Sequence, residues 1–564
     1  MGFVQANAQR TISGTVTSAS DGEPLLGATV LVKGTSVGTV TDFDGTYQIE
    51  ASDADVLVVS YTGYTQIEVP VGANSTIDIT MSEASEILSE VVVVGYSAQQ
   101  KKDLTGAVGV VDAEELKTIP SSNITSQLQG RVSGVTISGD GRPGQPAKVR
   151  IRGFASFSGA NDPLYVVDGV PTQDISTLNP NDIENISVLK DAGAASIYGS
   201  RASNGVILIT TKQGTNSGVK VSYDAFVGVQ DPGNGPENLL NTQGYADLQW
   251  LVYGNDGTSE THPVYGPSSS ARPSLPSWAA NTDWYDVLTR QAMIMNHDLS
   301  FSGGNENATF YAGLNYFNQE GIVIENFAKR YSARLNSTFK IANGKITLGE
   351  NLTVTGRSGN GIAGNGSEGG AFAMGVYRTQ PIIPAIIESP VQGIGRTFQP
   401  GEYGGTGLAP RLGNGDNMLA QQTRNADDRQ QDLRVLGSAF IDVQLMEGLN
   451  FRSTFGGTYQ SGYNTNWTNA TYESAENVAT SSYNEVGYFN ADWVWTNTLS
   501  FDKTFGMHSI KAVAGYESVK YGISRGVGAS RAGYFSTDYA FRTVDNGSQI
   551  TGANSNFNTP TTLV

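Results

Sequence analysis

The most restrictive feature of this chain is a series of long stretches after residue 217 in which apolar and polar residues alternate. In residues 219–229, VKVSYDAFVGV, the odd positions are apolar and most even positions are polar or Gly. The same alternation returns in residues 329–341 and 431–445. Successive side chains of a strand point to opposite faces of its sheet, and about ten residues suffice for a strand to cross a lipid bilayer. The sequence therefore predicts a large antiparallel sheet with one apolar face.

The connections between these runs differ sharply in length. The tight ones are Asn343–Gly344, Met446–Gly448 and Lys503–Gly506, and the long ones lie at 231–290, 356–430 and 460–487. Short turns at one end and long loops at the other are typical of outer-membrane β-barrels. A soluble β-sandwich also has alternating strands, but strand length and loop asymmetry favour the barrel. One run fits poorly, because Glu350 falls on the apolar side of residues 345–354.

Composition narrows the class of protein. A net charge of -18 over 564 residues argues against non-specific nucleic-acid binding, which needs a basic surface. The chain has no Cys, so it has no disulfide, thiolate ligand or thiol nucleophile. His262, His297 and His508 are scattered and match no metal or catalytic spacing. We therefore expect a non-enzyme without a cofactor.

The N-terminal part predicts a small domain of its own. Residues 11–82 contain seven short strand-like segments separated by Gly and Asp turns, which favours an Ig-like β-sandwich. Asp42 and Asp44 suggest either a calcium loop or a tight Asp-Gly turn, and the lack of further oxygen ligands favours the turn. Ala6 and Ala8 form an A-x-A pattern, which we interpret as the remnant of an export signal in residues 1–8. An ordinary N-terminal tail is the alternative.

Residues 83–103 resemble a linker, yet they contain four consecutive valines, Val91–Val94. Valine strongly favours the extended state, and an uncovered segment of this kind is an aggregation hazard without a partner. On its own the run suggests a buried structural strand. Its polar surroundings, including Lys101 and Lys102, favour instead a segment that pairs with another chain by strand addition.

Residues 104–214 predict an irregular α+β domain with many glycines and polar strands. Three strings within this domain are distinctive: VRIRG, PLYVVDGVP and SVLKDAGAASIYGSRASNGVILITTKQG. They resemble the plug of SusC-like TonB-dependent outer-membrane transporters. Residues 11–82 resemble the carboxypeptidase-regulatory-like extension domain of that family, and EVVVVGY resembles its TonB box.

This resemblance implies a mainly β fold in five parts. They are a signal-peptide remnant (1–8), the Ig-like sandwich (9–82), a linker with the TonB box (83–103), an α+β plug (104–214) and a partial antiparallel transmembrane barrel with long extracellular loops (215–564). Barrels of this family close with ~22 strands, and we count about nine strand candidates. We therefore expect a fragment, with an open sheet edge near Val519 and irregular structure over 520–564.

The resemblance also implies a function: TonB-dependent active import of a glycan oligomer or peptide across the outer membrane. The expected partners are a TonB-type energy-coupling protein, a SusD-like surface lipoprotein and outer-membrane lipid. A siderophore-type receptor is one alternative, against which the extension domain and the plug strings argue. A surface adhesin is another, but it has no use for a TonB box.

The resemblance singles out three groups of residues. The expected TonB-binding residues are Glu90, Val91, Val92, Val93, Val94 and Gly95. The expected plug–barrel contacts are Arg150, Arg152, Lys190, Asp191 and Arg201, for which solvated surface charge is the alternative. Candidate substrate contacts are Trp250, Trp284 and Tyr377. Loop packing and an interfacial girdle are the alternatives, and packing is favoured because aromatic side chains bury large areas wherever they lie.

Overall fold

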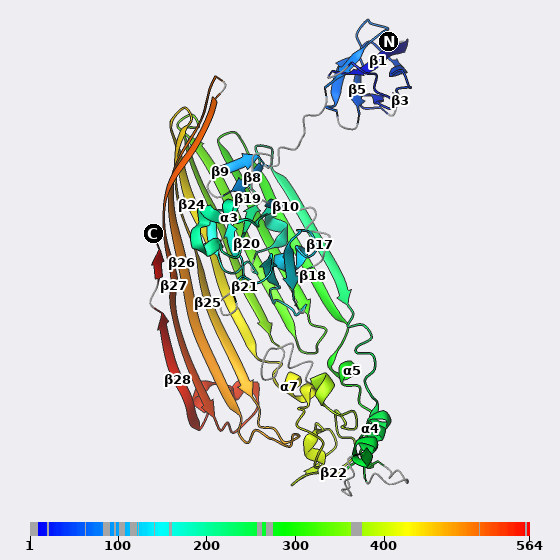
Figure 1. The fold of residues 1–564 in the computed structure, drawn as a ribbon, viewed down its shortest axis with the longest axis vertical. Coiled ribbons are helices and arrows are strands. Elements are labelled where there is room, and N and C mark those ends of the chain that lie inside the picture. The colour runs from blue at the N-terminus through cyan, green and yellow to red at the C-terminus, as the bar shows by residue number, and fades with distance from the viewer. Residues whose placement is uncertain are drawn as a thin grey trace, which may run out of the picture. The chain divides into compact units, whose positions relative to one another are not determined.

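The computed structural model describes residues 10–19, 22–35, 37–61, 64–82, 91–94, 97–100, 108–112, 121, 123–139, 141–156, 161–176, 178–255, 262–266, 275–361, 375–506, 508–558 and 561–563. The chain forms two compact units, one made of residues 1–92 and 98–104 and the other of residues 93–97 and 105–564. Figure 1 shows their elements. In the described part of the chain, no helix has the length and apolar character needed to cross a lipid bilayer.

The first unit is a two-sheet sandwich, as the sequence predicts. Its strands are β1 (Arg10–Ser18), β2 (Thr29–Val32), β3 (Gly38–Val40), β4 (Thr46–Ala51), β5 (Val56–Ser60), β6 (Ile67–Pro70) and β7 (Ile79–Met81). One sheet has the order β4-β1-β7 and the other β3-β2-β5-β6. Fully buried Ile12, Val16 and Leu57 fill the space between them. The Asp42 carboxylate accepts hydrogen bonds from Asp44 and Thr46 of its own turn.

The valine run forms strand β8 (Val91–Val94), which pairs with β9 (Ser97–Gln100) in a two-stranded sheet. The flanking residues 88–90, 95 and 96 lie outside the described residues. Two members of the expected TonB-binding set, Glu90 and Gly95, are among them.

The plug is built on a five-stranded mixed sheet with the order β10-β15-β16-β13-β14, beside a β11–β12 hairpin. Its elements are β10 (Val108–Asp112), α2 (Ile124–Gln127), β11 (Val135–Ser138), β12 (Lys148–Ile151), β13 (Leu164–Val167), β14 (Val170–Thr172), η2 (Pro180–Asp182), β15 (Ile183–Leu189), α3 (Ala192–Ala195), η3 (Ser196–Ala202) and β16 (Val206–Thr211). Asp168 and Gly169 both have positive φ, 47° and 86°, and join β13 to β14. Two positive φ values define the tight hairpin turn that matches the twist of its strands.

An antiparallel sheet follows, which we call the wall. Its strands are β17 (Lys220–Gln230), β18 (Ala292–Gly304), β19 (Ala308–Glu320), β20 (Phe327–Ile341), β21 (Ile346–Asn360), β24 (Arg429–Met446), β25 (Leu449–Thr468), β26 (Ser482–Phe505), β27 (His508–Ala532), β28 (Gln549–Asn558) and β29 (Thr561–Leu563). Within the described residues, ten of these eleven strands follow chain order from β17 to β28, while β29 pairs with β27. The tight turns lie at one end of the wall and the long connections at the other, as the sequence predicts.

The prediction of irregular structure after Val519 is wrong. Strand β27 continues to Ala532, and both β28 and β29 pair with it. Residues 520–532 are rich in Gly, Ser and Ala and do not alternate, so the sequence pattern does not predict a strand there. The structure nevertheless pairs these residues with the neighbouring strand β26.

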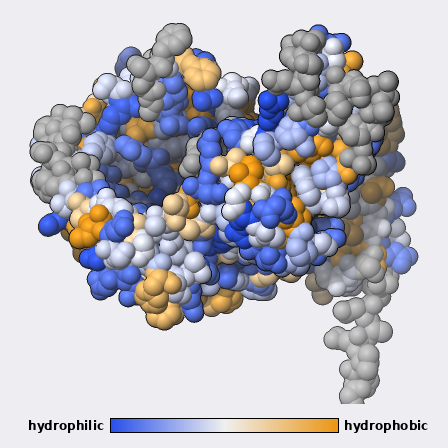
Figure 2. All heavy atoms as spheres, turned by 90° about the horizontal axis from the view of Figure 1, so that it is seen from below, coloured by the Kyte–Doolittle hydropathy of each residue, from blue (hydrophilic) through white to orange (hydrophobic). Residues whose placement is uncertain are grey.

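The two faces of the wall differ as the alternation predicts. Apolar side chains are exposed on the outward face, among them Val221, Tyr223, Leu335, Leu433, Phe455 and Leu499. The inward face carries buried polar side chains, among them Asp298, Asn315, Arg330, Arg334, Asn336 and Thr353. Seen from the long-loop end, the second unit is hollowed, and the residues visible in the hollow are largely hydrophilic (Figure 2). Glu350 remains on the outward face in an unshifted register, where its carboxylate accepts a 2.6 Å hydrogen bond from Ser337.

The described parts of the long connections, within residues 231–291, 361–428 and 469–481, pack into a layer of their own, which we call the loop layer. Its elements are α4 (Thr242–Asn255), α5 (Trp284–Leu288), β22 (Val391–Gln392), β23 (Thr397–Phe398), η4 (Thr406–Leu408) and α7 (Met418–Arg424). Two short turns, η5 (Tyr539–Phe541) and η6 (Val544–Asn546), lie between β27 and β28. Buried Tyr265, Trp284 and Phe398 are part of the apolar core of the loop layer. The described parts of these loops therefore pack around an apolar core.

Candidate functional site

The plug is held to the inward face of the wall by ion pairs, and most of their acidic members belong to the plug. The most buried pair joins Asp168, in the β13–β14 turn, to Arg334 of β20 at 3.1 Å, with side chains 9% and 2% exposed. Thr211 of the plug donates to the same carboxylate through its backbone N–H at 3.0 Å and its hydroxyl at 2.6 Å. Arg334 also donates to Thr353 of β21 at 3.0 Å.

A second plug carboxylate, Asp174, forms an ion pair with Arg434 of β24. Burial raises the pKa of Asp174, but the Arg434 charge and hydrogen bonds from Ser176 outweigh burial and leave the pKa below its ordinary value. Arg357 of β21 donates to the Ser176 hydroxyl at 2.9 Å and pairs with Asp432 at 2.8 Å. The plug segment 174–176 is thus fixed by arginines from two wall strands.

A third plug carboxylate, Asp182, is buried against β19. It accepts a 2.8 Å hydrogen bond from the Tyr311 hydroxyl. Burial raises its pKa, although the charges of Arg334 and Lys212 and the Tyr311 hydrogen bond oppose this rise. Gly313 provides the space, because a Cβ at that position would lie 2.9 Å from the Asp182 oxygen. Nearby, Asn179 of the plug donates to Asp298 of β18 at 2.6 Å.

The five plug residues expected from sequence to contact the barrel differ in where the structure places their contacts. Arg201 reaches the wall, where it pairs with Glu517 at 2.5 Å and donates to the Tyr521 hydroxyl at 2.7 Å. Arg152 pairs with Asp191 within the plug. Lys190 donates to the Ser133 carbonyl of the plug at 3.0 Å, and the Arg150 guanidinium lies 4.1 Å from the Phe154 ring centre.

Apolar contact between plug and wall includes a small cluster in which Val170 of β14 packs with Val494 and Val519 of the wall. A Cβ at Gly456 of β25 would lie 2.6 Å from Val170, so Gly456 lets β14 approach the wall closely. This apolar cluster has three buried members, so polar and charged contacts make up most of the plug–wall contacts described here.

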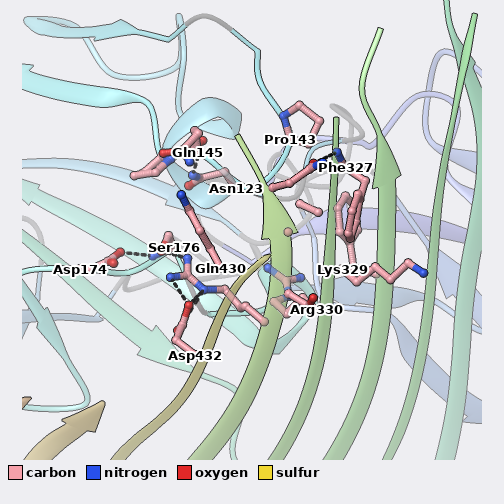
Figure 3. Close-up of a pocket in the computed structure, with 18 residues that line it drawn as sticks. Asn123, Pro143, Gln145, Asp174, Ser176, Phe327, Lys329, Arg330, Gln430 and Asp432 are labelled. Atoms are coloured by element: carbon pink, nitrogen blue, oxygen red, sulfur yellow. Dashed lines mark hydrogen bonds and ion pairs between the residues drawn. The ribbon is translucent and has the colours of Figure 1, made fainter. Parts of the chain in front are cut away.

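A cavity of about 320 Å³ lies between the plug and the ends of β20, β21 and β24 nearest the long loops. Asn123, Gln145 and Ser176 line it from the plug, and Arg330 and Asp432 line it from the wall (Figure 3). Arg330 is 4% exposed and donates to the Leu178 carbonyl of the plug at 3.1 Å. The polar lining suits water or a polar ligand.

The three aromatic residues proposed as substrate contacts lie in the loop layer. Trp284 is 3% exposed, and its ring N–H donates to the Gln380 carbonyl at 3.2 Å. Trp250 is partly buried and donates to the Tyr265 carbonyl. Tyr377 is 61% exposed and is the member of the three with substantial free surface.

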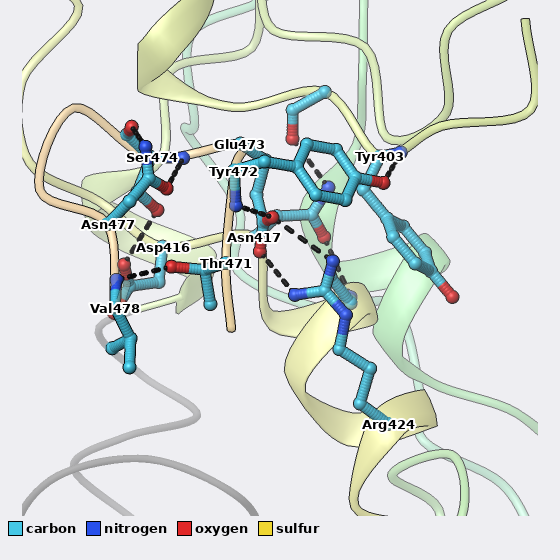
Figure 4. A network of polar contacts seen from close by, with 12 residues as sticks. Tyr403, Asp416, Asn417, Arg424, Thr471, Tyr472, Glu473, Ser474, Asn477 and Val478 are labelled. Carbon is cyan, nitrogen blue, oxygen red and sulfur yellow. Dashed lines mark hydrogen bonds and ion pairs between the residues drawn. The ribbon is translucent and has the colours of Figure 1, made fainter. Parts of the chain in front are cut away.

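A buried ion pair fastens the loop layer together. Arg424 of α7 donates to both carboxylate oxygens of Glu473, at 2.7 and 3.1 Å, and Glu473 is 1% exposed. The Arg424 guanidinium also lies 5.1 Å from the Tyr403 ring centre and 5.3 Å from that of Tyr472 (Figure 4). A two-point contact of this kind fixes orientation as well as distance, so loop 469–481 is held firmly to α7.

Comparison with known proteins identifies the parts of this architecture. Residues 100–206 match the family model described as TonB-dependent Receptor Plug Domain, and residues 12–94 match the CarboxypepD_reg-like domain. TonB-dependent receptor P26 of Formosa agariphila is 35% identical over 515 residues, which cover 89% of this chain and 48% of the relative. TonB-dependent receptor SusC of Bacteroides thetaiotaomicron is 40% identical over 339 residues, which cover 58% and 32%.

This chain is similar to SusC-like TonB-dependent receptors and contains their plug and CarboxypepD_reg-like domains. It spans about half the length of the curated relatives that match most of it. Among solved structures, the RagAB peptide transporter matches with a TM-score of 0.65 and 25% identity, over 81% of this chain and 52% of that one. In the described part of this chain, no group of three His, Asp or Glu side chains is arranged to hold a metal ion.

Sequence reasoning missed the acidic plug residues that contact the wall. It selected four basic plug residues and one acidic residue, Asp191, whereas the structure places Asp168 and Asp174 against Arg334 and Arg434. A signal was present: Arg334 occupies a polar position of an alternating run, and such positions face whatever fills the concave side of the sheet.

Proposed function

We propose that this chain is part of an active importer that carries a large nutrient, a glycan oligomer or a peptide, across an outer membrane. The observation that carries the proposal is the polar attachment of the plug to the wall, with Asp168–Arg334 as its most buried pair. A plug must close the pore at rest and leave it under force. Charged groups suit this task because water replaces their hydrogen bonds on separation, whereas apolar surface costs ~25 cal/mol per Å² when exposed.

The energy is proposed to come from a TonB-type protein that pairs with Val91–Val94. These residues form strand β8, and valine favours the extended state that strand addition needs. Backbone pairing requires little side-chain identity, so a run of one residue type is sufficient. A TonB-type partner would replace β9 or add to the free edge of β8.

Outer-membrane lipid is the proposed environment of the outward face. The exposed apolar side chains of β17–β27 would be costly in water as a continuous surface, and such surfaces normally mark a partner or a membrane. In lipid the same band is stabilising, since outer-membrane strands carry apolar residues outward and polar residues inward.

A SusD-like surface lipoprotein is the proposed partner on the long-loop side. Helix α4 supports this assignment, because Leu248, Leu251 and Val252 are 42%, 60% and 51% exposed. Residues at this spacing lie on one face of a helix. They form an apolar face suited to a protein partner.

The test is replacement of Val92 by proline in cells that depend on this receptor for growth on its nutrient. Proline removes a backbone donor and fixes φ, so strand pairing at β8 should fail. We expect uptake to collapse at normal surface expression, while Val92→Ile, which keeps a β-branched side chain, should transport normally. Uptake that survives Val92→Pro would contradict TonB-type coupling through this segment. Uptake confined to iron chelates would favour the siderophore-type alternative.

A further inference from the structure

Two carboxyl groups are buried where the plug meets the wall, and neither forms an ion pair in the part of the chain that the structure describes. Asp182 ends η2 of the plug and is 5% exposed, and Asp298 lies on the inward face of β18 and is 2% exposed. By contrast, Asp168 and Asp174 of the plug each pair with an arginine of the wall. The charge of the two buried carboxyl groups must therefore be balanced in another way.

Neutral groups supply the hydrogen bonds to both carboxyl groups. The Tyr311 hydroxyl of β19 donates to Asp182 at 2.8 Å. The Asn179 amide of the plug donates to Asp298 at 2.6 Å, and the same side chain also hydrogen-bonds to Asp182. Asn315 of β19 donates to Asp298 at 3.4 Å. Because Asn179 contacts both carboxyl groups, the two belong to one network that crosses from the plug to the wall.

Among the described residues, three cations face this network. Arg334 of β20 is already paired with Asp168, and Lys212, which follows β16, is only half-buried. Arg330 of β20 is 4% exposed and reaches the network through Asn315, whose side-chain oxygen accepts its guanidinium at 3.3 Å. One buried guanidinium thus lies beside two buried carboxyl groups. A single proton on one carboxyl group makes this buried cluster neutral.

The environment of Asp182 favours its neutral form. Burial raises the pKa of Asp182, and the neighbouring cations and hydrogen-bond donors do not reverse this rise. A carboxylate buried without an ion pair takes up a proton rather than remain charged, and a second carboxylate nearby makes ionisation of both still less favourable. The proton is assigned to the pair, because carboxyl groups that interact strongly titrate together.

We propose that Asp182 and Asp298 together hold one proton while the plug is seated, and that movement of the plug away from the wall releases it. On separation, water reaches both carboxyl groups, both ionise, and the proton passes to water; when the plug returns, one proton is taken up again. Low pH then favours closure and high pH favours opening. The inference concerns the regulation of plug release, and it rests on the plug movement of the proposed import function.

The expected pH dependence follows from this one proton. Above about pH 4 the carboxyl groups of the released plug and of the exposed wall are ionised, whereas the seated pair retains a proton. The equilibrium constant for opening should therefore rise up to about tenfold per pH unit and become constant once the seated pair has also ionised. A pair that is ionised in both states would give no such dependence.

The first experiment is infrared spectroscopy of the detergent-purified protein at about pH 5, where exposed aspartates are ionised. The carbonyl stretch of a protonated carboxyl group is separate from that of a carboxylate. We expect Asp182→Asn to remove the signal of one protonated carboxyl group. Asp298→Asn should do the same, because either substitution leaves one carboxylate to balance Arg330. The matched control is Asp174→Asn, which removes a plug carboxylate paired with Arg434 and should keep that signal.

The second experiment follows the plug itself. The chain has no Cys, and Ser332, 7% exposed, lies opposite Asn315 on the inward face of the wall. Ser332→Cys is therefore modified by a maleimide when the plug leaves this part of the wall. With rates normalised at each pH to those of the denatured chain, we expect a rise of up to about tenfold per pH unit above about pH 4. In this background, Asp182→Asn should make the rate independent of pH, and Asp174→Asn should retain the dependence.

A protonated-carboxyl signal that survives Asp182→Asn or Asp298→Asn would overturn the inference, as would equal pH dependence of modification with Asp and with Asn at position 182. Uptake separates this failure from failure of the import proposal. If Val92→Pro abolishes uptake but Asp182→Asn removes no protonated carboxyl group, the import function stands and the proton site is wrong. If Asp182→Asn removes that group but Val92→Pro leaves uptake intact, the proton site stands and TonB-type coupling is wrong.

Discussion

Removing Arg334 should loosen the plug more than any exposed substitution on the wall. In Arg334→Leu, the Asp168 carboxylate keeps the two hydrogen bonds from Thr211 but loses its cationic partner in a site where the pair is 2% and 9% exposed. Breaking one side of a buried ion pair costs ~3–5 kcal/mol. About 3 kcal/mol corresponds to roughly a hundredfold change in an equilibrium constant, and local separation of the β13–β14 turn from the wall should become that much more frequent.

The sequence offers a clean assay, because the chain contains no Cys. A single cysteine at Val170, which is 2% exposed and packed against the wall, is modified by a maleimide only when the turn separates. The modification rate then follows the opening equilibrium. We expect Arg334→Leu to raise this rate roughly a hundredfold. The modification rate in Arg334→Lys should lie between the rates of the unaltered Arg334 protein and Arg334→Leu, since an ammonium cannot reproduce the planar contacts of the guanidinium.

The control is Lys511→Leu, which breaks an exposed pair with Asp502 on the same wall. That pair spans 3.5 Å with side chains 61% and 63% exposed, and exposed pairs contribute about 0–1 kcal/mol. Its effect on the modification rate should stay below about fivefold. Equal rates in Arg334→Leu and Lys511→Leu would refute the argument that buried ion pairs hold the plug.

Two further predictions concern space and protonation. Gly313→Ala should lower the stability of the protein by ~1–3 kcal/mol, because the new Cβ would lie 2.9 Å from the Asp182 oxygen, and gel heat-modifiability should report this loss. The control is Gly356→Ala, where no atom lies within 4 Å of the new Cβ, and its gel heat-modifiability should be unchanged. Burial raises the pKa of Asp428, just before β24, from 3.8 to about 6, although the Trp467 N–H opposes the rise. The folded state therefore binds this proton more tightly than the unfolded state, so thermal stability should fall as pH rises from about 4 to 6. Asp428→Asn should make thermal stability less dependent on pH in this range. An unchanged pH dependence in Asp428→Asn would contradict the assignment to Asp428.

Local patterns in the sequence were enough to predict the strands and their faces. The seven strands of the sandwich and the inward or outward direction of β17, β20 and β24 follow from period-two alternation, which depends on neighbouring residues only. Gly153, Gly169 and Gly199 adopt positive φ of 97°, 86° and 64°, which glycine accepts more readily than other residues. Where alternation fades after Val519, prediction failed, because pairing with β26 determines that part of β27.

The partners of the charged residues could not be obtained in this way. Asp168 and Arg334 are 166 positions apart, and Asp174 and Arg434 are 260 apart. Alternation places each arginine on the inward face, but only the docked plug decides which carboxylate meets it. The expectation that Arg152 contacts the barrel depended on the same missing information, because Arg152 forms its ion pair with Asp191 within the plug.

The strand order of the plug indicates where an applied force would act first. Chain leaving the valine run enters the plug at β10, which is the edge strand of its sheet and pairs there with β15. The wall-bound carboxylates Asp168, Asp174 and Asp182 lie later, from the β13–β14 turn to the start of β15. Tension from the N-terminal side therefore meets one edge pairing before it reaches any of these three anchors. Because each anchor is a separate polar contact that water can satisfy, the anchors can yield one at a time, which requires less force than separating a single large apolar interface.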